Sequence, residues 1–201
     1  MFEFENRYKE HGFVAGLDEA GRGPLAGPVV VAIVIMPLEE DKIIPGVNDS
    51  KKLTEKKREE LFEKIKETAI DYKIVEIGHK TIDDINILAA TKLGAKKCVE
   101  GLMVKPYVVL TDALNFESPY PLESIIKGDM KSYNIAAASI LAKVYRDRLM
   151  RQLDNIYPEY GFAKHKGYGT RDHIKVLKEI GKCPIHRDSF IKNFVGGNDE
   201  K

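Results

Sequence analysis

The run of residues 29–36 constrains the fold more than any other part of the sequence. It is apolar throughout and rich in Val and Ile, whose branched Cβ atoms favour a strand over a helix. Because about 20 apolar residues are needed to cross a bilayer as a helix, this run is too short to do so. The residues at the N-terminus have neither the charge pattern nor the apolar run of a signal peptide. We therefore expect a strand in a cytoplasmic protein that does not contact a membrane.

Stretches with strand and helix patterns alternate along the chain. Further strands are predicted at residues 13–17, 72–77, 107–111 and 125–126. Helices are predicted at residues 55–70, 81–102 and 132–156, and a last helix begins at Thr170. Ile85 and Leu88 fall on the apolar stripe of the second helix and are expected to point inward. This order predicts an α/β fold with a mixed sheet, followed by a helical C-terminal portion.

The charge of the chain is unevenly distributed although its net value is only +1. Residues 127–192 hold 14 Lys and Arg against 7 Asp and Glu, so the remainder is acidic. A solvated surface with chance clustering explains this pattern as well as a metal-dependent nucleic-acid enzyme does. Cys98 and Cys183 have no partners at zinc-ligand spacing. We expect one domain over residues 1–201, with a core to about residue 156, a basic helical portion over 157–195 and a disordered tail at 196–201.

Four acidic residues stand where predicted strands end: Asp18, Glu19, Asp112 and Asp129. Neighbouring strand ends of an α/β sheet converge at one edge, so these carboxylates can meet in one pocket. Crowded carboxylates repel one another unless a cation lies among them, and oxygen ligands favour Mg²⁺ or Mn²⁺. Any one of these acids taken alone is more simply explained as a cap or turn former.

The glycine-rich segment at residues 21–28 resembles a dinucleotide-binding turn only superficially. It continues through Pro24 and Pro28 into a strand, so it lacks the helix whose N-terminus would receive a pyrophosphate. Its glycines instead allow another molecule to approach bare backbone amides, and Arg22 can reach a phosphate.

Six ordered motifs resemble those of the ribonuclease HII family, the prokaryotic type 2 ribonucleases H. They are residues 16–30 (GLDEAGRGPLAGPVV), 48–53 (NDSKKL), 111–112 (TD), 127–129 (KGD), 137–143 (AASILAK) with Arg146 and Asp147, and 165–170 (HKGYGT). The resemblance implies a ribonuclease H-like fold, a mixed five-stranded sheet flanked by helices with a helical C-terminal extension.

The resemblance also implies an activity and a set of site residues. Asp18, Glu19, Asp112 and Asp129 match the catalytic, metal-binding carboxylates, which use Mn²⁺ or Mg²⁺. The implied reaction is two-metal hydrolysis of RNA in RNA/DNA hybrids and at single ribonucleotides in duplex DNA, leaving 5′-phosphate and 3′-hydroxyl ends. Gly21, Arg22 and Gly23 match the ribose-recognising loop, and Tyr168 matches the tyrosine at the RNA to DNA junction.

Further residues are expected to bind substrate. Those placed to contact phosphate oxygens are Ser50, Lys51, Lys52, Ser139, Lys143, His165 and Lys166. Asp147 shares a helix face with Lys143, and an ion pair between them is favoured over a fifth metal ligand. His173 is expected to pack or cap.

Two other functions remain open at this point. One is a ribonuclease H-fold nuclease that acts on DNA, and the other is a hybrid-binding module without catalysis. The chain is expected to act as a monomer, and the sequence shows no obvious docking peptide for a sliding clamp.

Overall fold

One mixed sheet of five strands forms the centre of the computed structural model, which describes residues 1–195. The strands are β1 (Val14–Ala20), β2 (Val29–Ile35), β3 (Asp71–Ile77), β4 (Val108–Asp112) and β5 (Leu122–Ile125). Their order is β3-β2-β1-β4-β5, with β1 parallel to β4, β4 parallel to β5 and the other pairs antiparallel. The predicted mixed sheet is confirmed. The predicted tail at 196–201 lies outside the described residues.

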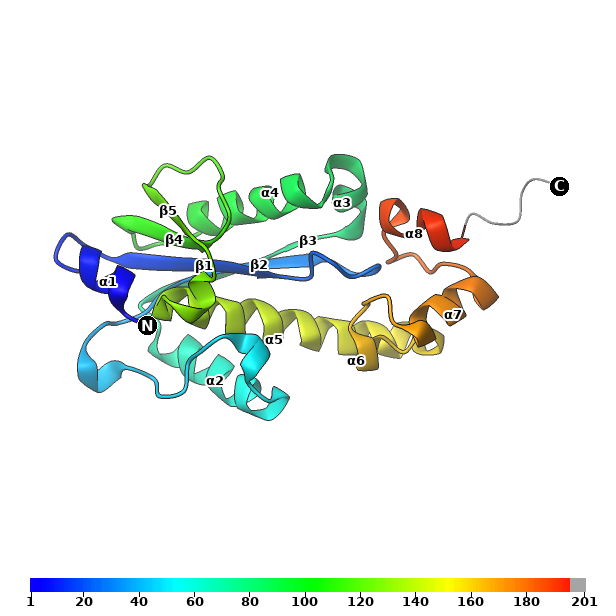
Figure 1. Ribbon diagram of the computed structural model, residues 1–201, viewed down its shortest axis with the longest axis horizontal. Helices are drawn as coiled ribbons and strands as arrows, with labels where there is room; N and C mark the ends of the chain where they lie inside the picture. The colour runs from blue at the N-terminus through cyan, green and yellow to red at the C-terminus, as the bar shows by residue number, and fades with distance from the viewer. Residues whose placement is uncertain (196–201) are drawn as a thin grey trace.

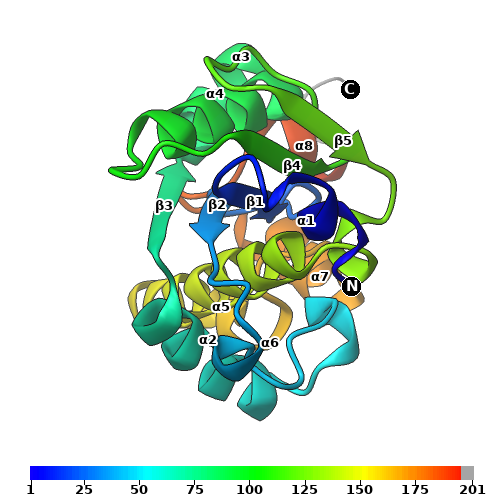
Figure 2. The same cartoon turned by 90° about the vertical axis from the view of Figure 1, so that its left-hand side faces the viewer.

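Helices cover both faces of the sheet (Figure 1; Figure 2). Helix α4 (Ile87–Glu100) lies on one face, and α5 (Tyr133–Ile156) with α2 (Glu55–Thr68) lies on the other. Along β2, Val31 and Ile33 pack toward α4, whereas Val30 and Val34 pack toward α2 and α5. The strand is therefore apolar at every position because each of its faces is buried.

The long helix α5 approaches β1 closely at Gly16. A Cβ atom on Gly16 would lie 2.1 Å from the carbonyl carbon of Asn134, so only glycine fits there. The first turn of α5 is fixed by Ser132, whose hydroxyl accepts from the Ile135 N–H at 3.1 Å. Buried Glu5, from helix α1 (Glu3–Tyr8), also accepts from the Asn134 N–H at 3.0 Å. These contacts fix the end of α5 that adjoins the strand carrying Asp18.

The predicted helix over residues 81–102 is wrong in one respect, because it is two helices. Helix α3 (His79–Ile85) ends at Asn86, whose φ of 67° breaks the chain before α4. The Asn86 side chain then caps α4 by accepting from the Leu88 and Ala89 N–H groups, each at 3.0 Å. Ile85 and Leu88, predicted to point inward, are 38% and 45% exposed because the break turns them outward.

The C-terminal portion packs at one end of the sheet (Figure 1). It contains η4 (Pro158–Tyr160), α6 (Phe162–His165), α7 (Arg171–Ile180) and α8 (Asp188–Val195). The helix that begins after Thr170 is therefore not the last one. Three short 3₁₀ turns complete the described chain: η1 (Glu40–Lys42), η2 (Ser50–Lys52) and η3 (Gly128–Met130). Within residues 1–195, no helix combines the length and apolarity that a membrane span requires.

Candidate active site

Asp18 and Glu19 lie within strand β1. The sequence had predicted that the strand ends at residue 17, directly before them. β1 extends to Ala20 because it continues to pair with β2, where Ala20 faces Val30. On its other side, the parallel pairing with β4 ends at Leu17 opposite Thr111. Asp18 and Asp112 each follow that last pair directly. Two of the four predicted carboxylates are thus brought to neighbouring positions on adjacent parallel strands.

Asp129 reaches the same place through the turn that follows β5. Lys127 adopts a left-handed conformation, with φ 57° and ψ 47°, and sends the chain into η3. The Gly128 N–H donates to Asp112 Oδ1 at 2.9 Å, which ties this turn to the end of β4. Asp129 is the next residue and is 6% exposed. Strand order alone therefore does not bring Asp129 to Asp112. The hydrogen bond from the preceding Gly128 N–H to Asp112 does so.

The charges of these carboxylates act on one another. Burial raises the pKa of Asp18 well above its ordinary value, and the negative charges of Glu19, Asp112 and Asp129 raise it further. Burial also raises the pKa values of Glu19 and Asp129. Such repulsion is relieved when a cation lies among the carboxylates, and the donor set is oxygen only, which suits Mg²⁺ or Mn²⁺. The residues fit a hard divalent cation.

The carboxylates converge without enclosing a finished coordination shell. Within residues 1–195, no three His, Cys, Asp or Glu side chains are drawn together closely enough to form a preassembled metal site. Asp18 Oδ1 accepts from the Glu19 N–H at 2.7 Å, and Glu19 Oε1 pairs with Arg22 Nη1 at 3.3 Å. Cation binding at this place would exchange such local contacts for metal ligation.

Asp49 is a neighbour of the site that the sequence reasoning missed. It is buried, and both its charge and a side-chain hydrogen bond help to raise the pKa of Asp129. Its Oδ1 also accepts from the Lys51 N–H at 2.9 Å. Lys51 is exposed, with its Nζ atom 4.0 Å from Asp129 Oδ2. The only sequence signal was the position of Asp49 inside the 48–53 motif.

Two buried arginines, Arg146 and Arg187, hold the 21–28 segment. Arg187 donates to the carbonyls of Gly21 at 2.6 Å, Arg22 at 3.0 Å and Gly27 at 2.9 Å. Arg146 donates to the carbonyls of Pro28, Ala26 and Lys166. Neither side chain is more than 1% exposed. The sequence reasoning gave Arg187 no role, because nothing local to it predicts contacts with residues 160 or more positions away.

Tyr168 lies beside the glycine loop, where the resemblance placed the junction tyrosine. A Cβ atom on Gly23 would lie 3.8 Å from Tyr168 Cε1, and Tyr168 is 46% exposed. The Gly167 carbonyl accepts from the Leu25 N–H at 2.8 Å, which joins the two loops through their backbones. An exposed aromatic ring thus stands next to the Gly21 to Gly23 amides.

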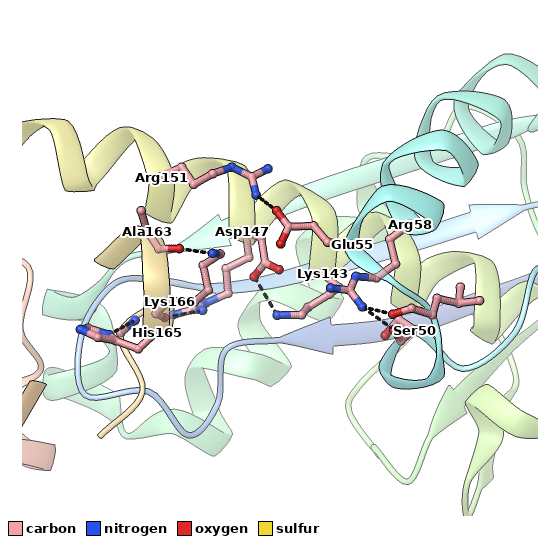
Figure 3. Close-up of polar contacts among 12 residues, drawn as sticks. Ser50, Glu55, Arg58, Lys143, Asp147, Arg151, Ala163, His165 and Lys166 are labelled. Carbon is pink, nitrogen blue, oxygen red and sulfur yellow. Dashed lines mark hydrogen bonds and ion pairs between the residues drawn. The ribbon is translucent and has the colours of Figure 1, made fainter. Parts of the chain in front are cut away.

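The side chains of the other predicted substrate contacts differ in their exposure and in the contacts they already make within the protein (Figure 3). Lys143 pairs with Asp147 at 2.7 Å, as favoured from the sequence, and Lys166 Nζ contacts the Ala163 carbonyl. Ser139 is buried and donates to the Ala136 carbonyl. Ser50 is also buried, whereas Lys51 and Lys52 are exposed.

His165 is placed differently from the expectation of a phosphate contact. It is buried, its Nδ1 accepts from the Gly167 N–H at 3.1 Å, and its Nε2 lies 2.7 Å from the Tyr160 carbonyl. Both ring nitrogens are occupied inside the protein, so His165 supports the loop that carries Tyr168. His173 is buried, as expected.

Comparisons with known proteins agree with this arrangement. The family model described as ribonuclease HII matches residues 15–193. Ribonuclease HII of Desulfitobacterium hafniense (strain Y51) is 59% identical over 178 residues, covering 88% of this chain and 68% of that protein. Ribonuclease HII of Caldicellulosiruptor saccharolyticus is 53% identical over 199 residues, covering 96% of this chain and 95% of that protein.

Solved structures show the same fold. The PCNA:RNase HII complex from Archaeoglobus fulgidus contains a chain that is 28% identical, with a TM-score of 0.75 over 94% of this chain and 97% of that one. Bst-RNase HIII in complex with Mn²⁺ is 18% identical, with a TM-score of 0.63 over 84% of this chain and 63% of that one. At that identity the second likeness concerns the fold alone, which confirms the expected ribonuclease H-like architecture.

Proposed function

The chain belongs to the ribonuclease HII family, and on that premise we propose that Asp18, Glu19, Asp112 and Asp129 are its catalytic carboxylates. Enzymes of this family, this chain included, are metal-dependent endonucleases that cleave RNA in RNA/DNA hybrids and remove ribonucleotides embedded in duplex DNA. The observation that carries the proposal is the convergence of the four carboxylates. Burial raises the pKa of Asp18 well above its ordinary value, and the charges of Glu19, Asp112 and Asp129 raise it further.

The four carboxylates would hold two Mn²⁺ or Mg²⁺ ions. Bound there, the ions supply Lewis acidity to the attacking water and to the leaving 3′ oxygen, giving 5′-phosphate and 3′-hydroxyl ends. The contribution of the chain is to aim the carboxylates at one place, which the β1 and β4 backbones and the Gly128 N–H do. The Mn²⁺ complex of Bst-RNase HIII is consistent with this choice of metal.

Recognition of the substrate falls to residues around the carboxylates. The ammonium group of exposed Lys51, which lies 4.0 Å from Asp129 Oδ2, is suited to neutralising a phosphate at that place. The amides of Gly21 to Gly23 are suited to the ribose 2′-hydroxyl, the group that distinguishes RNA from DNA. The Tyr168 ring is suited to packing on the following nucleotide, at the RNA to DNA junction.

The chain supplies all of these groups by itself. We therefore infer that a monomer is the active unit, that residues 1–201 work as one domain, and that RNA/DNA hybrids and ribonucleotide-containing duplex DNA are its macromolecular partners. The curated relatives are bacterial and the substrates are chromosomal, so we infer that the chain acts in the cytoplasm.

A duplex that contains one ribonucleotide tests the proposed site directly. We expect Mn²⁺-dependent cleavage 5′ of the ribonucleotide by the parent protein and a loss of at least ~100-fold in Asp18→Asn, because a neutral amide no longer helps to hold the cations. Asp41→Asn changes an exposed carboxylate on η1 and serves as the matched control. Near-normal cleavage by Asp18→Asn would refute the site. Cleavage of an all-DNA duplex would favour a DNA nuclease, and binding without cleavage would favour a non-catalytic module.

A further inference from the structure

Three buried histidines lie behind Tyr168 and take no part in the proposed chemistry. His165 and His173 are stacked, with ring centroids 4.4 Å apart, and His173 Nε2 lies 3.0 Å from His186 Nε2. Their surroundings are the rings of Tyr160 and Phe162. Two imidazole nitrogens at hydrogen-bond distance require one to donate and the other to accept, so the neighbouring contacts fix the tautomers.

The contacts of His186 determine the direction of this hydrogen bond. The Cys183 N–H can only donate, and it points at His186 Nδ1 at 3.0 Å. His186 Nδ1 also lies 3.2 Å from the Cys183 carbonyl and 3.2 Å from Cys183 Sγ. The Cys183 carbonyl already accepts from the His186 N–H at 3.1 Å. The Tyr168 carbonyl can only accept and lies 2.9 Å from His173 Nδ1, which leaves His173 Nε2 to accept from His186. His186 Nδ1 is therefore the accepting nitrogen, and in the neutral ring the proton is on Nε2. His186 Nε2–H donates to His173 Nε2.

The same reasoning continues from His173 to Tyr168. Because His173 Nε2 accepts, its proton is on Nδ1, which lies 2.9 Å from the Tyr168 carbonyl and donates to it. The Tyr168 N–H donates in turn to the His165 carbonyl at 2.9 Å. The Tyr168 N–H and carbonyl are thus both hydrogen-bonded inside the protein, while the ring remains exposed beside Gly23.

The segment that carries His186 also holds the glycine loop. Ala26 and His186 form an isolated β-bridge, the Gly27 N–H donates to the Ile185 carbonyl at 2.9 Å, and the next residue is Arg187. We call the Gly21 to Gly23 loop and the Tyr168 ring together the recognition surface. The segment with His186 contacts the glycine-rich segment through its backbone and Tyr168 through the imidazoles of His186 and His173.

We propose that His186, acting through His173, is a positioning residue that fixes the Tyr168 ring relative to the Gly21 to Gly23 loop and thereby determines selectivity for the RNA to DNA junction. The proposal rests on the proposed function, since it assigns a role to residues that support the same recognition surface. His186 does not touch the substrate. Its effect should appear in the choice between substrates more than in the rate on a uniform hybrid.

The tautomers can be measured in the parent protein without any substitution. Ring ¹⁵N chemical shifts at pH 7 should show the proton on Nε2 of His186 and on Nδ1 of His173. The opposite tautomer at either ring would overturn the proposal, because the chain of donors to the Tyr168 carbonyl would then be broken. This measurement does not depend on activity.

Substitutions test the effect on selectivity, measured as the ratio of cleavage at a single ribonucleotide to cleavage of a uniform hybrid at saturating Mn²⁺. His186→Asn keeps an acceptor for the Cys183 N–H but loses the donor to His173, and it should lower the ratio about five-fold, the low end for one lost stacking contact. His186→Gln places an amide N–H near the Nε2 position and should restore most of the ratio. His173→Gln removes the donor to Tyr168 and gives an independent second variant.

A Tyr168→Ala background separates positioning from general destabilisation. If His186 acts through the tyrosine ring, adding His186→Asn to Tyr168→Ala should leave the ratio unchanged. A further fall in that background, or equal losses on both substrates in His186→Asn alone, would overturn the proposal. Failure of the proposed function would appear differently, as absence of Mn²⁺-dependent cleavage by the parent protein or as near-normal cleavage by Asp18→Asn.

Discussion

At the scale of single residues, Arg187 shows how a buried cation can be stabilised without pairing with a carboxylate of residues 1–195. Its guanidinium group meets three backbone carbonyls of the 21–28 segment. Burial, together with the nearby Arg146 charge, lowers its pKa to about 9. The group therefore remains protonated at neutral pH. Its planar arrangement of donors matches the carbonyls of Gly21, Arg22 and Gly27.

Replacing this guanidinium should cost stability and activity together. The three N–H donors of a lysine share one nitrogen, whereas Arg187 reaches the three carbonyls from Nε, Nη1 and Nη2, so lysine leaves carbonyls without a donor. Each buried carbonyl left without a donor costs about 1–3 kcal/mol. We expect Arg187→Lys to lower the free energy of unfolding by about 2–4 kcal/mol in urea titrations. Cleavage should fall on both substrates, because the ribose-sensing loop is loosened. Arg171→Lys, at an exposed position on α7, is the control. Equal stability of the two variants would contradict this assignment.

At the scale of elements, the break between α3 and α4 depends on one residue. Asn86 combines φ 67° with ψ 164°, a region that only glycine adopts without strain, and its side chain caps two N–H groups. Asn86→Ala loses the cap and keeps the strain, so we expect it to lower the free energy of unfolding by about 2 kcal/mol. Asn86→Gly loses the cap but relieves the strain and should cost less than about 1 kcal/mol. Urea titrations of both variants check this, and equal losses would show that strain plays no part.

The elements also show which features local sequence can predict. Thr54, Ser132 and Thr170 stand at or directly before the starts of predicted helices, and each accepts the hydrogen bond of an N-cap. The break at Asn86 was missed because Ile85 and Leu88 continue the helical period across it. The end of β1 was placed too early, since polar Asp18 and Glu19 ended the apolar pattern while pairing with β2 continued. Long-range pairing decided what local pattern could not.

At the scale of the whole molecule, the site joins distant parts of the chain. Asp18, Glu19, Asp112 and Asp129 could be proposed from the sequence because they stand in three of the ordered motifs, at residues 16–30, 111–112 and 127–129. Arg187 and His186 lay outside those motifs, and their roles come from contacts with residues 13 to 166 positions away. A single sequence carries no signal for such contacts. The C-terminal portion was expected to supply basic groups for phosphates, and it also supplies the buried supports of the recognition loops.

The buried histidines make the stability of the whole molecule sensitive to acid. Burial lowers the pKa of His186 from its ordinary value of 6.5 to about 4, and it lowers the pKa values of His165 and His173 as well. Below pH 6.5 the unfolded chain takes up protons at these rings while the folded chain does not. Their contribution to stability is therefore full above pH 6.5 and is lost as the pH falls toward 4. Asp18, Glu19 and Asp129 act in the opposite direction, because their raised pKa values let the folded state bind protons first.

A comparison of variants isolates the histidine contribution from that of the carboxylates. One titrating group contributes about 1.4 kcal/mol per pH unit, so between pH 6.5 and 5 His186 accounts for a loss of about 2 kcal/mol in the parent protein. His186→Gln removes this titration and keeps a donor toward His173. The fall in free energy of unfolding over that interval, measured by urea titration, should therefore be smaller in His186→Gln by about 2 kcal/mol. His11→Gln, at an exposed position, serves as the matched control. Identical slopes in the parent and His186→Gln would contradict this prediction, because they would mean that His186 is protonated in the folded protein. A protonated Nδ1 could not accept the hydrogen bond from the Cys183 N–H.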